Sequence, residues 1–260
     1  VFLESPTDTS IRDQLTRLTG ILDCWEALAN IFTRYLDDSL ADDETSREIA
    51  LMVGHLYDEK LYTWQPAKEN FERVLRNDPA DEEAFRLLEQ LLMRHEQWQE
   101  LLELYRNTVD ATLDSSKRRD LMFKIARVWE EALEDMTAAI EAYQNILDED
   151  NDQLAVEALE RLYRDTERWE DLCELINRQM DFVDDAAELI EMKFRLGRIY
   201  EERLLNLGAA IDHYEEVLNR DAEHRRAIAA LEQLVMDREQ RYRIAQILEP
   251  IYRNADEWAK

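Results

Sequence analysis

The sequence predicts an all-α fold, an array of helical hairpins stacked one on the next, and three observations support this. Only four glycines and four prolines occur in 260 residues, too few for the turns of a β-rich protein of this length. Apolar residues recur at three- and four-residue spacing, as in Leu121, Ile125 and Val128, which is typical of helices with one apolar face. Similar segments also recur along the chain, which indicates a repeat architecture.

The repeat is clearest around three tryptophans. "LTGILDCWEAL" at 18–28, "LMRHEQWQEL" at 92–101 and "LYRDTERWEDL" at 162–172 are variants of one segment. Their Trp25, Trp98 and Trp169 lie 73 and 71 residues apart. One unit is therefore about 72 residues long, which is enough for four helices of ordinary length.

A second set of matches lies between the tryptophan segments. Each match has a small residue, an aromatic residue three positions later, and then Ala-x-x-x-aromatic. The three sets are Gly54, Tyr57, Ala67 and Phe71; Ala126, Trp129, Ala139 and Tyr143; and Gly197, Tyr200, Ala210 and Tyr214. A small residue lets two helices approach closely, and the aromatic side chain fills the remaining space. Because an isolated helix of about 14 residues is marginal in water, each apolar face is expected to pack on a neighbouring helix.

The sequence predicts the helices in order along the chain. Fourteen are expected, near 11–22, 24–38, 44–61, 66–77, 81–94, 97–113, 116–133, 137–148, 152–165, 168–183, 186–204, 208–220, 223–237 and 240–254. Short polar side chains accept hydrogen bonds from the first N–H groups of a helix, so Ser10, Asp81, Ser115 or Ser116, and Thr137 are the expected N-caps.

The predicted breaks between units are "NDPAD" at 77–81 and "DEDND" at 148–152. They give approximate units at 11–80, 81–151, 152–222 and 223–260 within one array over 1–260. The last unit is irregular, because Trp258 lies 89 residues after Trp169, and Pro250 is expected to kink the last helix. The chain begins without Met and ends in what resembles the start of another helix, so we expect a segment of a longer array.

The matched residues resemble tetratricopeptide repeats (TPR), whose motif ends in Ala-x-x-x-aromatic and a closing Pro. Residues 47–80 are the clearest copy, with Pro79 at the end, whereas 119–151 and 190–222 lack that Pro. All three copies carry one extra residue between the motif halves. They also have Val74, Ile146 and Val217 where the family usually has Ala. Their alternation with degenerate, Trp-bearing hairpins is similar to long bacterial TPR arrays.

The resemblance implies an α-solenoid of about seven antiparallel hairpins wound into a right-handed superhelix. Its concave groove would be lined by the first helix of each hairpin and would hold a peptide or a helical segment of a partner protein. Such arrays assemble other proteins and are not enzymes as a rule. The resemblance therefore implies a protein–protein interaction scaffold.

Composition and charge limit the classes of partner. The formal net charge of −28 repels nucleic acid phosphates and favours basic partners. No apolar run approaches 18 residues, so membrane insertion is not expected. Cys24 and Cys173 are far apart and form neither a disulfide framework nor a zinc motif. The first residues do not read as a signal peptide, but in a segment of a longer protein this says little about the compartment, so the location stays open, with the cytoplasm favoured.

Motifs for chemistry are lacking. The four histidines are scattered without metal-binding spacing, and no phosphate-binding Gly loop occurs. "DEDNDQ" at 148–153 begins like a calcium loop but has Gln153 in place of the required Gly and Leu159 in place of the required Glu, which favours an acidic turn with a capping Asp. We therefore expect no catalytic activity, no cofactor and no metal.

The candidate binding residues come from the TPR geometry, which implies that certain first-helix positions face the groove. They are Phe123, Lys124 and Arg127 in the second copy, Phe194, Arg195 and Arg198 in the third, and Met52 and His55 in the first. Arg and Phe together suit recognition of a partner's acidic stretch. The alternative is that the basic side chains pair within the chain with acids such as Glu130 and Glu201.

Three functions remain open from the sequence. The leading hypothesis is a scaffold that binds a peptide or helix of another protein. The second is a self-associating array that forms a homodimer through exposed ends, because terminal repeats normally need polar caps. The third is the regulatory or interaction arm of a larger enzyme or signalling protein.

Overall fold

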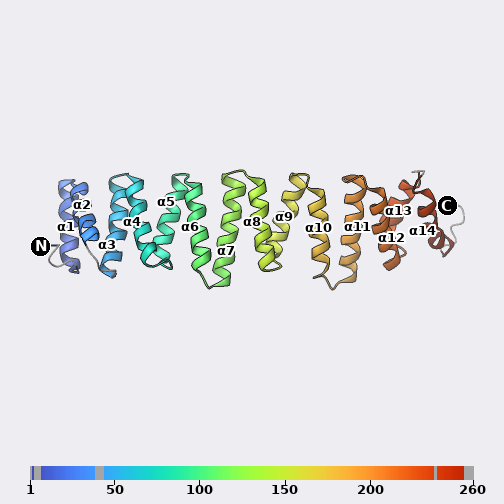
Figure 1. Ribbon diagram of the computed structural model, residues 1–260, viewed down its shortest axis with the longest axis horizontal. Coiled ribbons are helices and arrows are strands. Elements are labelled where there is room, and N and C mark those ends of the chain that lie inside the picture. Colours follow the sequence, from blue (N-terminus) through green and yellow to red (C-terminus); the bar gives the residue numbers. More distant parts are fainter. Residues whose placement is uncertain (1, 3–6, 39–43, 237–238, 255–260) are drawn as a thin grey trace. The chain divides into compact units, whose positions relative to one another are not determined.

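The computed structural model describes residues 2, 7–38, 44–236 and 239–254, and every regular element in these ranges is helical (Figure 1). The α-helices are α1 (Thr9–Leu22), α2 (Trp25–Asp38), α3 (Glu44–His55), α4 (Trp64–Asn77), α5 (Glu82–Arg94), α6 (Trp98–Ala111), α7 (Ser115–Arg127), α8 (Met136–Glu149), α9 (Gln153–Asp165), α10 (Trp169–Met180), α11 (Ala186–Glu202), α12 (Leu207–Arg220), α13 (Arg225–Leu234) and α14 (Arg241–Asn254). Two π-helical segments, η2 (Leu56–Lys60) and η3 (Val128–Ala132), follow α3 and α7. The prediction of an all-α array of about fourteen helices is confirmed, whereas the handedness of the superhelix stays a prediction.

Most predicted helix bounds are within about three residues of the observed ones, but three predicted N-caps are wrong. Ser10, Ser115 and Thr137 each lie inside a helix. A carboxylate just upstream makes the cap instead: Asp8 accepts from the N–H of Ser10, Asp114 from those of Ser116 and Lys117, and Asp135 from that of Ala138. An ionised acceptor also interacts favourably with the positive end of the helix dipole, so Asp is favoured over the nearby hydroxyls. Asp81 caps α5 as predicted.

The chain divides into two compact units, residues 1–142 and 143–260, and the boundary falls within α8. In the first unit, called unit 1 below, each of α1 to α6 packs against the next helix in sequence. Fully buried side chains such as Phe32, Ile49, Phe71 and Leu101 form its core. Unit 1 therefore buries its apolar faces between consecutive helices, as a stacked array does.

The second unit, called unit 2 below, repeats this arrangement. Helices α9 to α14 each pack against the next helix in sequence. Tyr214, Val217, Leu231 and Ile244 are fully buried in the core that α11 to α14 share. The single array over 1–260 and its four approximate units stay predictions.

The turns within the hairpins share one unusual backbone feature. Among the described residues, six other than Gly have a left-handed conformation, with φ between 51° and 56°: Asp23, Tyr62, Glu96, Glu134, Glu167 and Leu205. Each lies two residues before the first residue of α2, α4, α6, α8, α10 or α12. The same turn therefore joins the two helices of every hairpin from α1 to α12.

The extra residue of the TPR-like copies lies just before this turn. In the hairpin of α5 and α6, the N–H of Gln97 bonds the carbonyl of Leu92, five residues back. In that of α3 and α4, the N–H of Thr63 bonds the carbonyl of Tyr57, six residues back. The wider π-helical turn of η2 takes up the added residue, so that α4 still begins two residues after the left-handed Tyr62, as the second helix does in the other hairpins.

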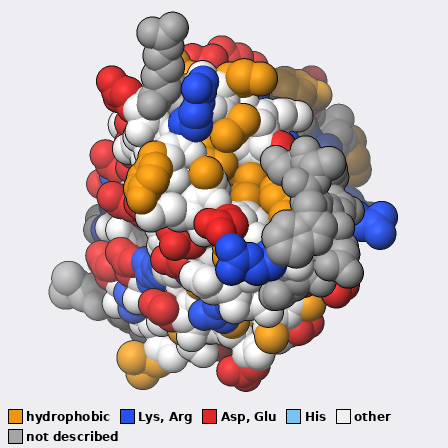
Figure 2. All heavy atoms as spheres, turned by 90° about the vertical axis from the view of Figure 1, so that its right-hand side faces the viewer, with side chains coloured by type: hydrophobic (Ala, Val, Ile, Leu, Met, Phe, Trp, Pro, Cys, Tyr) orange, Lys and Arg blue, Asp and Glu red, His pale blue; other side chains and the backbone are white. Residues whose placement is uncertain are grey.

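The last hairpin differs from the sequence prediction in one respect. Pro250 lies inside α14, which is continuous from Arg241 to Asn254. The predicted kink stays a prediction, and Trp258 lies outside the described residues. Tyr242 and Met236 are exposed in this hairpin, and Figure 2 shows apolar side chains lying among charged ones on this side of the molecule. Dimerisation through an array end also stays a prediction.

Candidate functional site

The TPR-like signature residues form the contact between the two helices of a hairpin. A Cβ added to Gly54 would lie 2.3 Å from a ring carbon of Phe71, and one added to Gly197 would lie 2.5 Å from a ring carbon of Tyr214. These distances are far inside van der Waals contact, so only Gly fits at either position. Ala67 and Ala210 are fully buried on the facing helices. These residues hold the scaffold together and are not available to a ligand.

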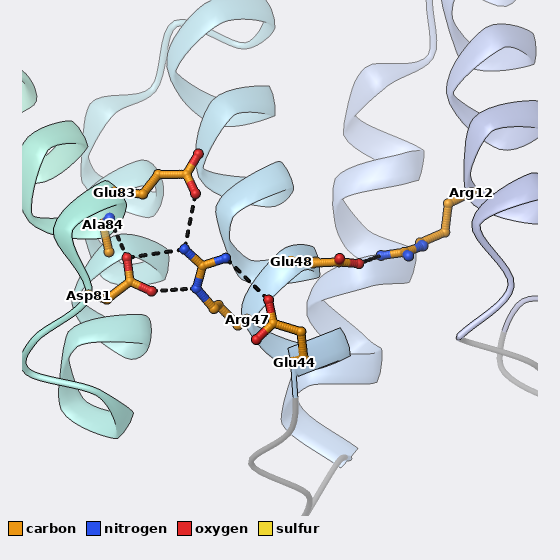
Figure 3. Close-up of polar contacts among 7 residues, drawn as sticks. All are labelled: Arg12, Glu44, Arg47, Glu48, Asp81, Glu83 and Ala84. Atoms are coloured by element: carbon orange, nitrogen blue, oxygen red, sulfur yellow. Dashed lines mark hydrogen bonds and ion pairs between the residues drawn. The ribbon is translucent and has the colours of Figure 1, made fainter.

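Within each unit, ion pairs link the first helix of a hairpin to the first helix of the next hairpin. Arg12 of α1 lies 2.8 Å from Glu48 of α3, and Arg47 of α3 bonds Asp81 at the start of α5 (Figure 3). Further along, Glu82 and Glu89 of α5 pair with Lys117 and Lys124 of α7 at 3.0 and 2.6 Å; in unit 2, Glu160 and Glu191 pair with Arg195 and Arg226. The partners are 34 to 36 residues apart, the length of one hairpin. We call this series the ion-pair ladder.

Arg47 makes the most extensive contacts of the ladder. Figure 3 shows its guanidinium lying between Asp81, Glu83 and Glu44. Its Nη2 is 3.0 Å from Glu83, and its Nη1 is 3.4 Å from Glu44. Asp81 also accepts a 2.8 Å hydrogen bond from the N–H of Ala84. Burial opposes ionisation of Asp81, but the hydrogen bonds from Arg47 and from the N–H of Ala84 outweigh it, and the pKa of Asp81 is lowered.

The predicted groove residues of the second copy lie on α7. Lys124 is paired with Glu89 and also lies over the rings of Phe85 and Tyr105, at 5.7 and 5.6 Å. The Arg119 guanidinium is 4.9 Å from the ring centre of Phe123, which is half-buried. Arg127 is exposed and makes no ion pair with any residue that the structure describes.

The predicted residues of the third copy are less accessible. Phe194 is only 6% exposed, because its ring packs between Tyr214 and His224. Arg195 forms two hydrogen bonds with Glu160, at 3.0 and 2.6 Å. Arg198 bonds Glu202 on its own helix. The Phe194 side chain is thus part of the core, and both basic side chains have carboxylate partners.

The two first-copy residues have contacts within unit 1. Met52 is half-buried against the core. His55 lies 3.4 Å from Glu59, and its ring centre is 6.0 Å from that of Phe71. The structure therefore leaves Phe123 and Arg127 as the predicted residues that combine an aromatic ring with an unpaired cation.

Sequence reasoning missed a groove on the opposite side of the hairpins in unit 1. It lies between the second helices α4 and α6, has a volume of about 470 Å³, and has an apolar lining formed by Leu75, Leu88, Leu92 and Leu104. We call it the α4–α6 groove. The only sequence signal is that small polar residues occur on α6 at Asn107 and Thr108, where the next repeat has Arg178 and Gln179.

Burial shifts the pKa of several titratable side chains in the helical cores. Burial, and then the charge of Glu170, raise the pKa of the Cys173 thiol to about 11, so this residue is protonated at neutral pH. Burial lowers the pKa of His213, which keeps the imidazole neutral. Burial and a 2.7 Å hydrogen bond to Glu89 raise the pKa of Tyr105.

Metal-binding clusters and membrane-spanning helices are both absent from the described ranges. No three His, Cys, Asp or Glu side chains in those ranges converge in a way that could hold a metal ion. None of the described helices is both long and apolar enough to cross a membrane. Asp152, in the segment that begins like a calcium loop, caps α9 by accepting from the N–H groups of Leu154 and Ala155.

No protein family profile matches the chain, and no curated protein matches it. Among solved structures, YrrB, described as a TPR protein with an unusual peptide-binding site, is similar at 14% identity and a TM-score of 0.35, over 78% of this chain and 99% of that one. The C-terminal part of a TPR repeat-containing protein from Cytophaga hutchinsonii is similar at 14% identity and a TM-score of 0.38, over 92% and 93%. A tetratricopeptide repeat protein from Parabacteroides merdae is similar at 15% identity and a TM-score of 0.35, over 81% and 87%.

The hairpins themselves decide the architecture. Helices α1 to α7 and helices α9 to α14 pack in sequence order, the same left-handed turn recurs in each hairpin from α1 to α12, and Gly contacts an aromatic ring in both units. Each unit is therefore a stack of helical hairpins with TPR-like Gly–aromatic contacts.

Proposed function

We propose that the chain is a non-catalytic interaction scaffold and that its first-helix face binds a segment of another protein. The observation that carries this proposal is the arrangement of α7. Phe123 and Arg127 lie one helical turn apart, and Arg127 is an exposed cation without an ion pair among the described residues. An aromatic ring next to such a cation supplies both apolar contact and hydrogen-bond donors, the combination that dominates many protein interfaces.

The ion-pair ladder limits which basic residues take part. Lys124 and Arg195 are already bonded to Glu89 and Glu160. A partner carboxylate would have to displace those acids, and the exchange of one carboxylate for another gives little net free energy. The contact is therefore centred on α7, and the bound segment needs at most one acidic side chain or a backbone carbonyl for Arg127.

The test uses peptides selected from a random library for binding to the whole chain. Fluorescence anisotropy then compares the wild type with the double variant Phe123→Ala/Arg127→Glu. We expect about tenfold or greater loss of affinity, because both anchors are removed. The control is Phe182→Ala/Arg17→Glu, which alters an exposed Phe and an exposed Arg without a described ion pair and changes the net charge equally. Equal binding by the two variants, or failure to select any peptide, contradicts the proposal.

A further inference from the structure

The α4–α6 groove is a second accessible surface, separate from the first-helix face. Its lining covers about two and a half turns of α4, from Lys68 to Arg76, and about three turns of α6, from Glu100 to Ala111. At 1.5 Å per residue the α4 wall is roughly 12 Å long and the α6 wall roughly 16 Å. Lys68 and Glu100 join the two helices at one end through a 2.6 Å ion pair. The groove is therefore a short trough, bridged at one end.

Its floor retains accessible apolar surface. Leu88 and Leu92 of α5 are 2% and 1% exposed and form the base. Leu75 of α4 and Leu104 of α6 are only half-buried on the two walls. Leu75 and Leu104 thus leave apolar surface exposed on facing walls, above an apolar base. Covering this surface with an apolar side chain of a partner lowers the free energy.

The corresponding place in unit 2 is closed by side chains. Arg178 of α10 bonds Asp148 of α8 at 2.8 Å and the carbonyl of Leu147 at 2.6 Å. The next residue, Gln179, bonds Asn151 at 2.9 Å. The wall leucines beneath these bridges are only 3% and 6% exposed at Leu147 and Leu175. In unit 2 the chain thus covers this surface with its own side chains.

Unit 1 lacks every part of that cover. Asn107 is at the position of Arg178, and Thr108 at the position of Gln179, and both are too short to cross between the helices. Arg76 takes the place of the acceptor Asp148. The Thr108 hydroxyl is bonded to the carbonyl of Leu104 on its own helix. The α4–α6 groove and the matching position between α8 and α10 are both formed by the second helices of hairpins. The groove is therefore open because its side chains are short, and not because its helices differ.

The charges around the groove indicate which segment fits it. Its lining contains three acids, Glu72, Glu100 and Glu103, and two bases, Lys68 and Arg76. Lys68 contacts two of the acids, at 2.6 Å from Glu100 and 3.5 Å from Glu72. Glu103 is exposed on the α6 wall and has no ion pair among the described residues. The C-terminal ends of α4 and α6 also favour cations, and the net charge of −28 attracts basic chains from a distance.

We propose that the α4–α6 groove binds a short amphipathic helix of another protein, which places aliphatic side chains on the four leucines and a Lys or Arg against Glu103. About three turns of helix match the length of the walls, and apolar anchors at i, i+3/i+4 and i+7 would follow the floor. This site is independent of the first-helix face, so each proposal can fail without the other.

The test uses a closed variant of the whole chain, Arg76→Asp/Asn107→Arg, which installs the Asp and Arg of unit 2 at the matching positions. Arg76→Asp changes the charge by −2 and Asn107→Arg by +1, so the variant is more acidic than the wild type. The probe is a fluorescein-labelled 15-residue peptide with Leu at helical spacing and Lys elsewhere. Control peptides replace every Lys by Glu, or every Leu by Ser.

We expect the closed variant to bind the Leu/Lys peptide at least about tenfold more weakly than the wild type. Attraction by net charge alone predicts the opposite, tighter binding to the more acidic variant, and that result overturns the proposal. Equal binding of the Leu/Glu or the Ser/Lys peptide to the wild type also overturns it. Ala111→Trp, which adds an uncharged bulky side chain to the lining, is the second variant and should weaken binding as well. Circular dichroism checks that both variants are folded.

Discussion

Between α4 and α6 the side chains of Asn107 and Thr108 stop short of the facing helix, and the wall leucines stay half-exposed. At the matching place in unit 2, Arg178 reaches across to α8 and Gln179 to Asn151, two residues after α8, and the leucines are buried. The helical frame is shared, because the same turn and the same Gly–aromatic contact occur in both units. An accessible surface in this array is therefore set by a few long or short side chains.

The largest expected effect concerns what the two units share. Gly54→Ala and Gly197→Ala each place a methyl group within 2.5 Å of a ring carbon of Phe71 or Tyr214. We expect each to lower the free energy of unfolding by about 3 kcal/mol, because the rings are buried and cannot move aside. Urea unfolding followed by circular dichroism measures this.

Gly20→Ala is the matched control, because its added Cβ has only ordinary contacts, at 3.5 Å from Trp25. It should raise the free energy of unfolding by about 0.5 kcal/mol through better helix propensity. If Gly54→Ala behaves like Gly20→Ala while Gly197→Ala does not, the α3–α4 and α11–α12 hairpins are not packed in the same way. The two units could then not be compared as the same helical frame with different surface side chains.

The next effect concerns the strongest junction of the ion-pair ladder in unit 1. Asp81→Ala removes both the cap on Ala84 and the partner of Arg47. We expect a loss of about 2 kcal/mol, roughly half of it from the cap. Asp114→Ala, which removes a cap only, should cost about 1 kcal/mol.

The same junction predicts a pH dependence. Because the pKa of Asp81 is lowered in the folded state, its charge contributes stability that is fully present above the pKa of the unfolded chain. That contribution is lost as the pH falls through the folded value, below about pH 4. The difference in stability between wild type and Asp81→Asn should therefore shrink on acidification over that range. A difference that is constant from pH 6 to pH 3 contradicts this account of Asp81.

A third prediction reverses the difference between the units. Arg178→Asn/Gln179→Thr removes the side chains that cover the groove position in unit 2, and should lower the free energy of unfolding by about 1 kcal/mol. It should also expose Leu147 and Leu175 and add binding capacity for the Leu/Lys peptide, measured as a higher stoichiometry in calorimetry. Unchanged stoichiometry would show that the covering side chains alone do not explain why the α4–α6 groove is open and the α8–α10 position is closed.

The sequence predicted the frame well and the surfaces poorly, for a physical reason. Gly54, Phe71 and their repeats are constrained by close packing within a hairpin, so their spacing is visible in the chain itself. The exposure of Phe194 and the pairing of Lys124 depend on side chains one hairpin away, such as Glu89. Three predicted N-caps are wrong because Asp, Ser and Thr can all cap a helix, and only the backbone geometry shows which of two nearby residues makes the hydrogen bond. The α4–α6 groove is open because Asn107 and Thr108 have short side chains, and short side chains do not form a recognisable sequence motif.

The smallest effect concerns the left-handed turns that both units share. Leu205 is 77% exposed at φ 52°, and Glu96 has φ 55° in one of the turns of unit 1. A side chain with a Cβ costs about 1 kcal/mol in this conformation, whereas Gly adopts it freely but gains more entropy on unfolding. Leu205→Gly and Glu96→Gly should therefore raise the free energy of unfolding by about 0.5 kcal/mol each. Leu113→Gly, an exposed Leu outside the left-handed region, should lower it by a similar amount. If all three variants lose stability alike, the turns are fixed by contacts other than backbone conformation, and their recurrence in both units needs another cause.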